Sequence, residues 1–218
     1  VWMHTLKVVD EAAEICKREE LDSETSLIVM VSSLCHDLGK ATTTTQKEGR
    51  YISHGHEAAG EEPTRSFLQS IGASKAMTEK VVSLVVNHLQ PTLLYTDTEI
   101  RGQKVSDGAI RRLADRIYPA TIRELVLVAE ADHMGRGPYD TPESREALML
   151  PTDTYPPRDW LLERARNLKV EDSKPSDLTR GKDWIAFGFK PGPEFRQLIT
   201  LSNDLRDDKG FGREQVFQ

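Results

Sequence analysis

Apolar residues recur along the chain at the three- and four-residue steps of helical faces, separated by short polar breaks. From Trp2 to Glu19 one apolar stripe predicts a first helix. A second helix is expected to begin at a cap formed by Asp22 or Ser23 and to end at Gly39, because glycine commonly terminates helices. No convincing strand pattern is found, so the predicted fold class is all-α.

Prolines and polar segments set the expected boundaries of the middle helices. A third helix is expected from a Ser53 cap, kinked or interrupted by Pro63. A fourth is expected from near Ser74 until Pro91 stops it. The polar segments 41–53 and 92–105 are expected to be irregular.

The second half of the chain predicts further helices joined by longer polar segments. The stretch 135–157 carries five prolines, so we expect a long crossing loop with one short helix at 143–150. Pro157 is expected to open a helix, because proline is favoured in a first turn. The helix that begins at Pro157 is expected to reach Leu168, and a polar linker is expected at Val170–Lys182. The other helices are expected from near Ser106, at Ala120–His133, at Asp183–Phe187 and at Pro193–Leu205.

The composition limits the class of protein. The chain has 218 residues, of which 38% are hydrophobic, enough for one large domain or one domain with an appendage. Cys16 and Cys35 fall on apolar helix faces without zinc-type spacing, so we expect buried free thiols in a reducing compartment, the cytoplasm. No apolar run approaches the ~20 residues that span a membrane, and no signal peptide is visible, so no membrane partner is expected.

The charge and the start of the chain bear on its partners. The formal net charge is −6, whereas a domain that binds RNA mainly through phosphates is usually basic. A nucleotide or an RNA end could still be bound locally if a metal supplied the positive charge. The chain starts without a methionine, and His4, a candidate metal ligand, lies almost at its start. We therefore expect the chain to be a fragment of a longer protein.

The segment 34–40 places a histidine and an aspartate side by side at the expected end of the second helix. His36 and Asp37 offer one imidazole nitrogen and one carboxylate oxygen, a donor pair suited to a divalent first-row metal. The pair alone is weak evidence, because adjacent His and Asp residues arise by chance. Its weight comes from an ordered set of metal-type ligands on other predicted helices, which comprises His4 before the pair and His56, His88 and Asp132 after it.

Four segments carry a resemblance to a known family: VWMHTL at 1–6, LCHDLGKATTT at 34–44, HGHEAAG at 54–60 and EADHMGRG at 130–137. In them the chain resembles the HD superfamily of metal-dependent phosphohydrolases, and more closely the C-terminal HD domain of bacterial CCA-adding enzymes, the tRNA nucleotidyltransferases. The segment KPGPEF at 190–195 is similar to the tail of these enzymes. The resemblance implies an HD helical bundle over 1–150 and a helical C-terminal extension over 151–218.

We predict that His4, His36, Asp37 and Asp132 bind a divalent metal, which could be manganese, nickel, cobalt, magnesium or iron. Two imidazoles and two carboxylates leave positions open for water and a phosphoryl oxygen. A single histidine on an apolar face is more often a buried structural residue, so the prediction depends on the joint pattern and the resemblance. In two-metal relatives, histidines placed like His56 and His88 hold a second ion; in single-metal ones they face the phosphate. Both alternatives stay open.

Other polar residues are candidates for substrate contacts. Lys40 is expected either to meet a substrate phosphate at the mouth of the site or to be a helix-end charge that favours the helix dipole. Arg136 is a second candidate for the phosphate, and His54 is either a substrate contact or a solvated loop residue. His133 is expected to point away from the ligands. The predicted catalytic residues are Asp37, Lys40, His56 and His88.

The resemblance implies hydrolysis of nucleotide or RNA-end phosphoesters, with 2′,3′-cyclic phosphodiesterase, 2′-nucleotidase and phosphatase activities. The alternative is a non-catalytic tRNA-binding module of a CCA-adding enzyme, against which the acidic charge argues. A minor alternative is oxygen chemistry at a di-iron site, since a few HD relatives are oxygenases. The sequence shows no P-loop, no Gly-x-Ser-x-Gly elbow and no paired aspartates of the nucleotidyltransferase kind, so CCA addition itself is not expected of these residues. Nothing in the sequence predicts the oligomeric state.

Overall fold

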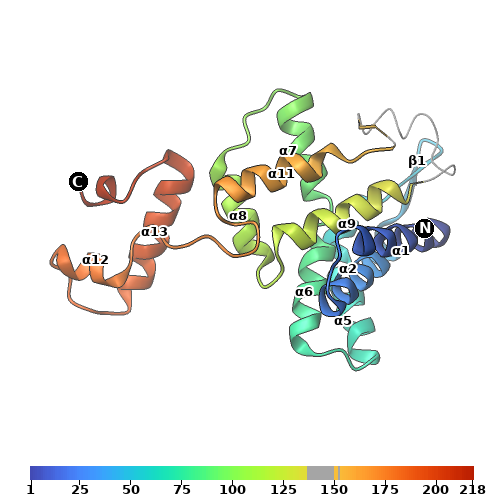
Figure 1. The fold of residues 1–218 in the computed structure, drawn as a ribbon, viewed down its shortest axis with the longest axis horizontal. Helices are drawn as coiled ribbons and strands as arrows, with labels where there is room; N and C mark the ends of the chain where they lie inside the picture. The colour runs from blue at the N-terminus through green and yellow to red at the C-terminus, as the bar shows by residue number, and fades with distance from the viewer. Residues whose placement is uncertain (137–149, 152) are drawn as a thin grey trace.

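Helices make up the body of the molecule, which confirms the all-α prediction. The computed structural model describes residues 1–136, 150–151 and 153–218. Figure 1 shows a helical body with a smaller C-terminal unit to one side. Among the described residues, strands are confined to one antiparallel hairpin.

The first half of the chain contains helices α1 (Trp2–Arg18), α2 (Ser23–Cys35), α3 (Lys40–Thr43), α4 (His56–Ala59), α5 (Glu61–Ser70), α6 (Lys75–Asn87) and α7 (Gln90–Tyr95), strands β1 (Thr45–Lys47) and β2 (Arg50–Ile52), and the π-helix η1 (Thr96–Ile100). The second half contains α8 (Asp107–Ile117), α9 (Ile122–Met134), α11 (Pro156–Asn167), α12 (Gly181–Ala186), α13 (Glu194–Lys209) and the 3₁₀-helix η2 (Glu214–Phe217).

Helices α1, α2, α6 and α9 pack against one another and form the core. Apolar residues on their facing sides are fully buried, and each such side chain stabilises the folded state by roughly 1.5–3 kcal/mol. Examples are Val8, Val29, Leu84, Leu125 and Val128. The core therefore fixes the relative positions of the ends of these helices, and the candidate ligands lie at those ends.

Side-chain caps define several helix starts where the sequence predicts them. Asp22, Ser74 and Ser106 are N-cap residues whose side chains accept hydrogen bonds from backbone amides of the first turn. Thr121 and Glu124 form a reciprocal capping box at the start of α9. Each such cap contributes about 1 kcal/mol to helix stability.

The structure corrects the role expected for Gly39. Helix α2 ends at Cys35, and Gly39 lies after a turn, immediately before α3, with φ −66°, a right-handed conformation open to any residue. Glycine is required there for a different reason: a Cβ atom would overlap the carbonyl oxygen of His56 and lie 2.6 Å from the amide nitrogen of Gly60. Gly39 thus allows α3 to lie against α4.

Two segments expected to be irregular have regular structure. Residues 45–52, within the predicted loop 41–53, form the β1–β2 hairpin. Pro91 does not end a helix but lies in the first turn of α7, where its missing N–H needs no partner, and helical structure continues to Ile100. The third helix is interrupted, but at Gly60 between α4 and α5 and not at Pro63, which lies in the first turn of α5, where proline is tolerated. The expected Ser53 cap is also wrong, because the N-cap residue of α4 is Gly55.

Helix α11 belongs to the same core although it follows residue 150. It packs against α9, with Leu161 and Ala165 fully buried. The division of the chain at residue 150 stays a prediction. The short helix expected at 143–150 lies outside the described residues, except for the buried Leu150.

The two cysteines are buried free thiols, as predicted from their positions on apolar faces. Burial raises the pKa of the Cys35 thiol to about 12, so it stays protonated and unreactive. Across the described part of the chain, every helix is too short or too polar to cross a lipid bilayer.

The C-terminal unit consists of α12, α13 and η2. It packs around Trp184, whose ring contacts Phe189 and Phe217. Helix α13 docks this unit on α8, where Arg111 lies 3.1 Å from Asp207. The closest approach is at Gly108 on α8, where a Cβ atom would overlap the backbone carbonyl of Asp207. The contact therefore depends on the absence of a side chain at position 108.

We expect Gly108→Ala to weaken this docking, because the added methyl group pushes α13 away from α8. Forcing a methyl group into a packed contact typically costs about 1–3 kcal/mol. Faster hydrogen exchange in α13 and a lower urea midpoint would report it. The matched control is Gly212→Ala, whose Cβ would meet only Gln215 Oε1, at 3.6 Å. Equal exchange rates in wild type and Gly108→Ala would contradict the prediction.

Candidate metal centre

Four helix ends and the turn after α2 bring the predicted ligands together. His4 lies in the first turn of α1, and Asp132 lies in the last turn of α9. His36 and Asp37 follow the last residue of α2, and His88 follows the last residue of α6. The remaining ligand, His56, is the first residue of α4.

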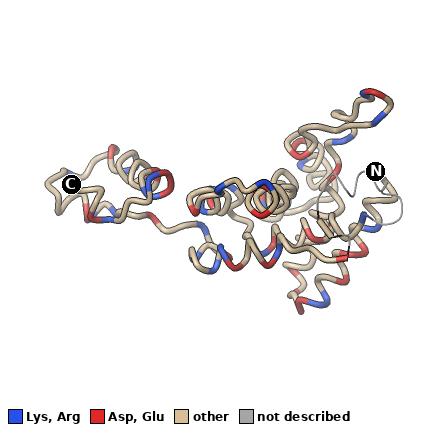
Figure 2. The backbone as a smooth tube through the Cα atoms, turned by 90° about the horizontal axis from the view of Figure 1, so that it is seen from above, with Lys and Arg blue, Asp and Glu red and all other residues tan. Residues whose placement is uncertain are grey.

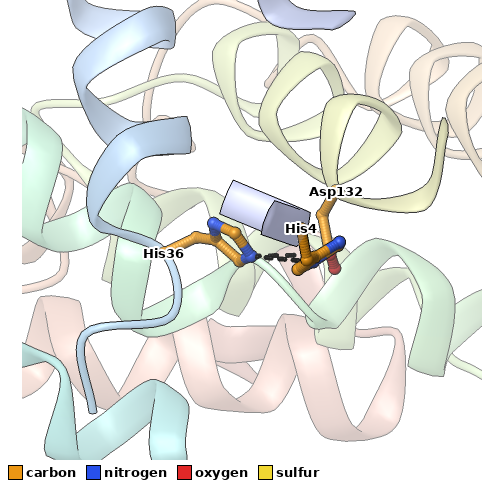
Figure 3. Close-up of side chains that lie close together, drawn as sticks. All are labelled: His4, His36 and Asp132. Atoms are coloured by element: carbon orange, nitrogen blue, oxygen red, sulfur yellow. Dashed lines mark hydrogen bonds and ion pairs between the residues drawn. The ribbon is translucent and has the colours of Figure 1, made fainter. Parts of the chain in front are cut away.

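The first group of ligands consists of His4, His36 and Asp132, drawn in Figure 3. The Nε2 atom of His4 lies 3.0 Å from Asp132 Oδ1 and 3.3 Å from the Nε2 atom of His36. His36 Nε2 lies 3.6 Å from the same carboxylate oxygen. Three donor atoms from three helix ends therefore point at one another.

A second group consists of Asp37, His56 and His88. Asp37 connects it to the first group, because its two carboxylate oxygens face different histidines. Its Oδ2 atom lies 3.3 Å from His36 Nε2, and its Oδ1 atom lies 3.5 Å from His56 Nε2. The His88 ring lies 5.4 Å from those of both His36 and His56, measured between centroids. Asp37 therefore lies in contact with histidines of both groups.

All four histidine rings are held in the same way. In each ring Nδ1 donates a hydrogen bond to a backbone carbonyl, so the neutral ring presents an Nε2 lone pair to the other ligands. A hydrogen bond of this kind orients metal-binding histidines and sets their tautomer. The pairs are His4 with Gly135 (3.3 Å), His36 with Ser33 (2.7 Å), His56 with Ser53 (2.8 Å) and His88 with Val85 (2.6 Å).

The donor set fits divalent metal ions. His88 Nε2 is buried and has no hydrogen-bond partner in the described structure, which is costly for a polar atom unless a ligand satisfies it. The Nε2 atoms of His4 and His36 face each other at 3.3 Å, a repulsive arrangement for two lone pairs unless a proton or cation lies nearby. Each group offers two imidazole nitrogens and one carboxylate, which suits a first-row divalent metal and leaves positions open on it.

Electrostatics keeps both carboxylates ionised. Burial alone would raise the pKa of Asp132, but the contact with the His4 imidazole and the charge of Arg136 outweigh burial and hold this pKa well below its usual range. For Asp37, burial is likewise outweighed, by His36 and Lys40, and the pKa is lowered. Burial opposes a charge on His36, yet Asp37 and Asp132 raise its pKa. His36, Lys40 and Arg136 therefore lie close to the two buried carboxylates and partly compensate their negative charge.

The structure places the predicted substrate residues at different distances from the ligands. Lys40 Nζ lies 2.8 Å from Asp37 Oδ2. Lys40 is the first residue of the four-residue helix α3, which follows the end of α2 closely, so both alternatives, a phosphate contact and a helix-end charge, stay open. Arg136 lies 3.6 Å from Asp132 Oδ2. His54 is exposed and has no hydrogen-bond or ion-pair partner among the described residues.

His133 points away from the ligands, as expected. Its Nε2 atom lies 2.7 Å from the carbonyl oxygen of Pro151, and its ring packs against Tyr155. Its neighbour Glu130 also has a structural contact, a bidentate pair with Arg18 at 2.8–2.9 Å that holds α1 on α9.

Residues missed by the sequence reasoning are the ones that orient the rings. Ser33, Ser53 and Val85 each lie three residues before a histidine, a spacing that the sequence displays but that has meaning only where a helix ends or a turn begins. Gly135 could not be found in this way. Its carbonyl accepts from His4, and a Cβ there would lie 2.8 Å from the Cα atom of Val8 on α1.

The family model of the HD domain matches residues 1–148 of this chain. Curated relatives carry the name Multifunctional CCA protein. That of Pasteurella multocida is 28% identical over 174 residues, which cover 78% of this chain and 37% of the relative. That of Methylococcus capsulatus is 29% identical over 79% of this chain and 35% of the relative. That of Laribacter hongkongensis is 31% identical over 62% of this chain and 30% of the relative.

The chain thus spans about a third of the length of these relatives. No solved structure matches it.

We expect the metal-free protein to lose stability below neutral pH through His88. Burial lowers the pKa of His88 from 6.5 to about 4, so below pH 6.5 the unfolded chain binds a proton that the folded chain does not. This stability is fully present above pH 6.5 and is lost as the pH falls towards 4; at pH 5 the loss is roughly 2 kcal/mol. Urea unfolding in EDTA at pH 7 and pH 5 measures it.

The variant His88→Gln should lack this part of the pH dependence, and the exposed His54→Gln should keep it. If wild type and His88→Gln lose equal stability between pH 7 and pH 5, His88 is not held neutral.

Proposed function

Because the chain belongs to the HD domain family, we propose that it is a metal-dependent phosphohydrolase that acts on nucleotide or RNA-end phosphoesters. The observation that carries the proposal is the shared orientation of four imidazoles. Each Nδ1 is hydrogen-bonded to the backbone, and each Nε2 faces a site that contains Asp37 and Asp132. Imidazole nitrogens and carboxylate oxygens that converge in this way favour the binding of cations.

The chemistry follows from the donor set. A divalent ion held by these residues would supply Lewis acidity to a phosphoryl oxygen and would lower the pKa of a bound water molecule. We assign His4, His36, Asp37 and Asp132 as ligands, with Asp37 shared between the two groups. Lys40 is assigned to a substrate phosphate oxygen, because a flexible ammonium at the edge of the ligand set can neutralise charge there. Arg136 and the exposed His54 are assigned to the outer part of the substrate.

The second ligand group favours a second ion over direct contact of His88 with the phosphate. His88 is only 1% exposed, and its low pKa makes it a poor proton donor at neutral pH. Its Nε2 atom is the unpartnered one, and Asp37 Oδ1 lies on the same side, near His56. We therefore assign His56 and His88, with Asp37, to a second ion rather than to proton transfer.

The similarity to Multifunctional CCA proteins supports RNA as the source of the substrate, with tRNA as a candidate partner. We propose residues 1–150 as the catalytic unit and 151–218 as an extension that contributes α11 to its core, and we expect a cytoplasmic setting. The alternative, a non-catalytic tRNA-binding module, does not require four oriented imidazoles, and the net charge of −6 argues against it.

The activity is tested with 2′,3′-cyclic AMP, 2′-AMP and an aryl phosphate, each with manganese, nickel, cobalt, magnesium or ferrous iron. We expect turnover with at least one combination of substrate and metal. His36→Ala or Asp132→Asn should lower kcat/KM at least about 100-fold, because even the loss of a residue that only hydrogen-bonds to a metal ligand lowers metal affinity or activity about 10- to 100-fold. His133→Gln is the control, an imidazole beside the site that points to Pro151. Absence of turnover in every combination would refute the proposal.

The number of ions is tested separately by elemental analysis. Wild-type protein should hold close to two ions per chain, and His56→Ala or His88→Ala should remove about one of them while His4 and His36 keep the other. Undiminished metal content in both variants, with only a lower rate, would instead place these histidines at the phosphate.

A further inference from the structure

The β1–β2 hairpin is an exposed arm next to the candidate metal centre. Residues 44–51 are all exposed, and the hairpin projects from the helical body (Figures 1 and 2). Its pairs are Thr45–Ile52, Gln46–Tyr51 and Lys47–Arg50. An isolated two-stranded hairpin is only marginally stable in water, so its base must be held by the rest of the protein.

Both legs of the hairpin are fixed to predicted ligands. Before β1, Lys40 Nζ lies 2.8 Å from Asp37 Oδ2. After β2, the carbonyl of Ser53 accepts the hydrogen bond from His56 Nδ1, at 2.8 Å. The legs are joined by a 2.8 Å hydrogen bond between the hydroxyls of Thr44 and Ser53. A molecule bound to the hairpin would therefore lie in a defined place relative to the site.

The tip carries two cations that oppose each other. Lys47 and Arg50 are directly paired across the strands, an arrangement that destabilises a hairpin. Neither has an ion-pair partner among the residues that the structure describes. Glu48 is the only acidic residue in the hairpin, so the tip is positive although the chain as a whole is negative. Binding of an anion between Lys47 and Arg50 would relieve their repulsion.

The neighbouring residue offers an aromatic surface. Tyr51 is 77% exposed and lies on the other face of the hairpin from Arg50, because successive strand residues point to opposite faces. A single strand of nucleic acid that crosses the edge of β2 would place its phosphates on the face that carries Arg50 and its bases on the face that carries Tyr51. Stacking of a base on an aromatic ring is a common means of holding single strands.

We propose that the β1–β2 hairpin binds the single-stranded RNA that leads to the phosphoester at the candidate metal centre. Arg50 and Lys47 contact a backbone phosphate, and Tyr51 stacks on a base. Arg50 is three residues from Ser53, roughly 10 Å along an extended strand, so the contacts fall within the first few nucleotides from the reactive end. This inference depends on the proposed function for its substrate, and it specifies polymers over mononucleotides.

The decisive variant is Arg50→Glu. It turns the repulsive pair with Lys47 into an attractive one, so the hairpin itself should become more stable, while the tip changes from positive to negative. Fluorescence anisotropy with labelled hexaadenylate measures binding. We expect roughly tenfold weaker binding for Arg50→Glu, from the loss of a charge-assisted contact, and weaker binding for Tyr51→Ala. Lys75→Glu, at the start of α6 and thus at the far end of this helix from His88, makes the same change of charge as a control and should bind like wild type.

Kinetics separate this inference from the proposed function. With a hexanucleotide that ends in a 2′,3′-cyclic phosphate, Arg50→Glu should lower kcat/KM about tenfold, whereas kcat/KM for 2′,3′-cyclic AMP should stay unchanged. If no cyclic phosphate is hydrolysed, the proposed function fails, and the anisotropy still tests the arm. Hexaadenylate binding that is equal in wild type and Arg50→Glu, or weakened equally by Lys75→Glu, overturns the inference.

Discussion

The hydrogen bond from each histidine Nδ1 to a backbone carbonyl is the interaction on which the site depends. It removes the freedom of the ring to rotate and leaves a lone pair on Nε2 in a known direction. At His36 and His88 the accepting carbonyls belong to the last turns of α2 and α6, where the regular hydrogen bonding of the helix ends, and the Val85 carbonyl also accepts from the His88 amide at 3.5 Å. Ending a helix and orienting a ligand are therefore achieved by the same bond.

Close backbone contacts bring these oriented rings into one place. Gly39 lets α3 lie against α4, which carries His56, and Gly135 lets the end of α9 lie against α1, which carries His4. A methyl group at either position would separate elements whose donor atoms lie 3–4 Å apart. Both glycines are therefore needed because they lack a side chain at a close contact, and neither has a left-handed backbone conformation.

The site concentrates negative charge in a buried position. Asp37 and Asp132 stay ionised because His36, Lys40 and Arg136 face them. Burying carboxylates with incomplete compensation is unfavourable, and a divalent cation is the charge that would balance them. The same reasoning applies in reverse to the hairpin tip, where Lys47 and Arg50 repel each other and an anion is the missing partner.

The sequence by itself determined the helical class and most helix starts, and it singled out the histidines and aspartates that the fold brings together. Apolar spacing and cap residues such as Ser74 and Ser106 are local signals, because a helix forms from contacts within a few residues of chain. Only the tertiary structure decided that Asp37 faces both ligand groups, that Lys40 pairs with Asp37, and that Gly39 is needed for a close contact with α4. These features join residues from separate elements, and their geometry depends on how whole helices pack. The β1–β2 hairpin escaped prediction for a related reason: its strands are only three residues long and almost entirely exposed, so they show none of the alternation that burial on one face imposes.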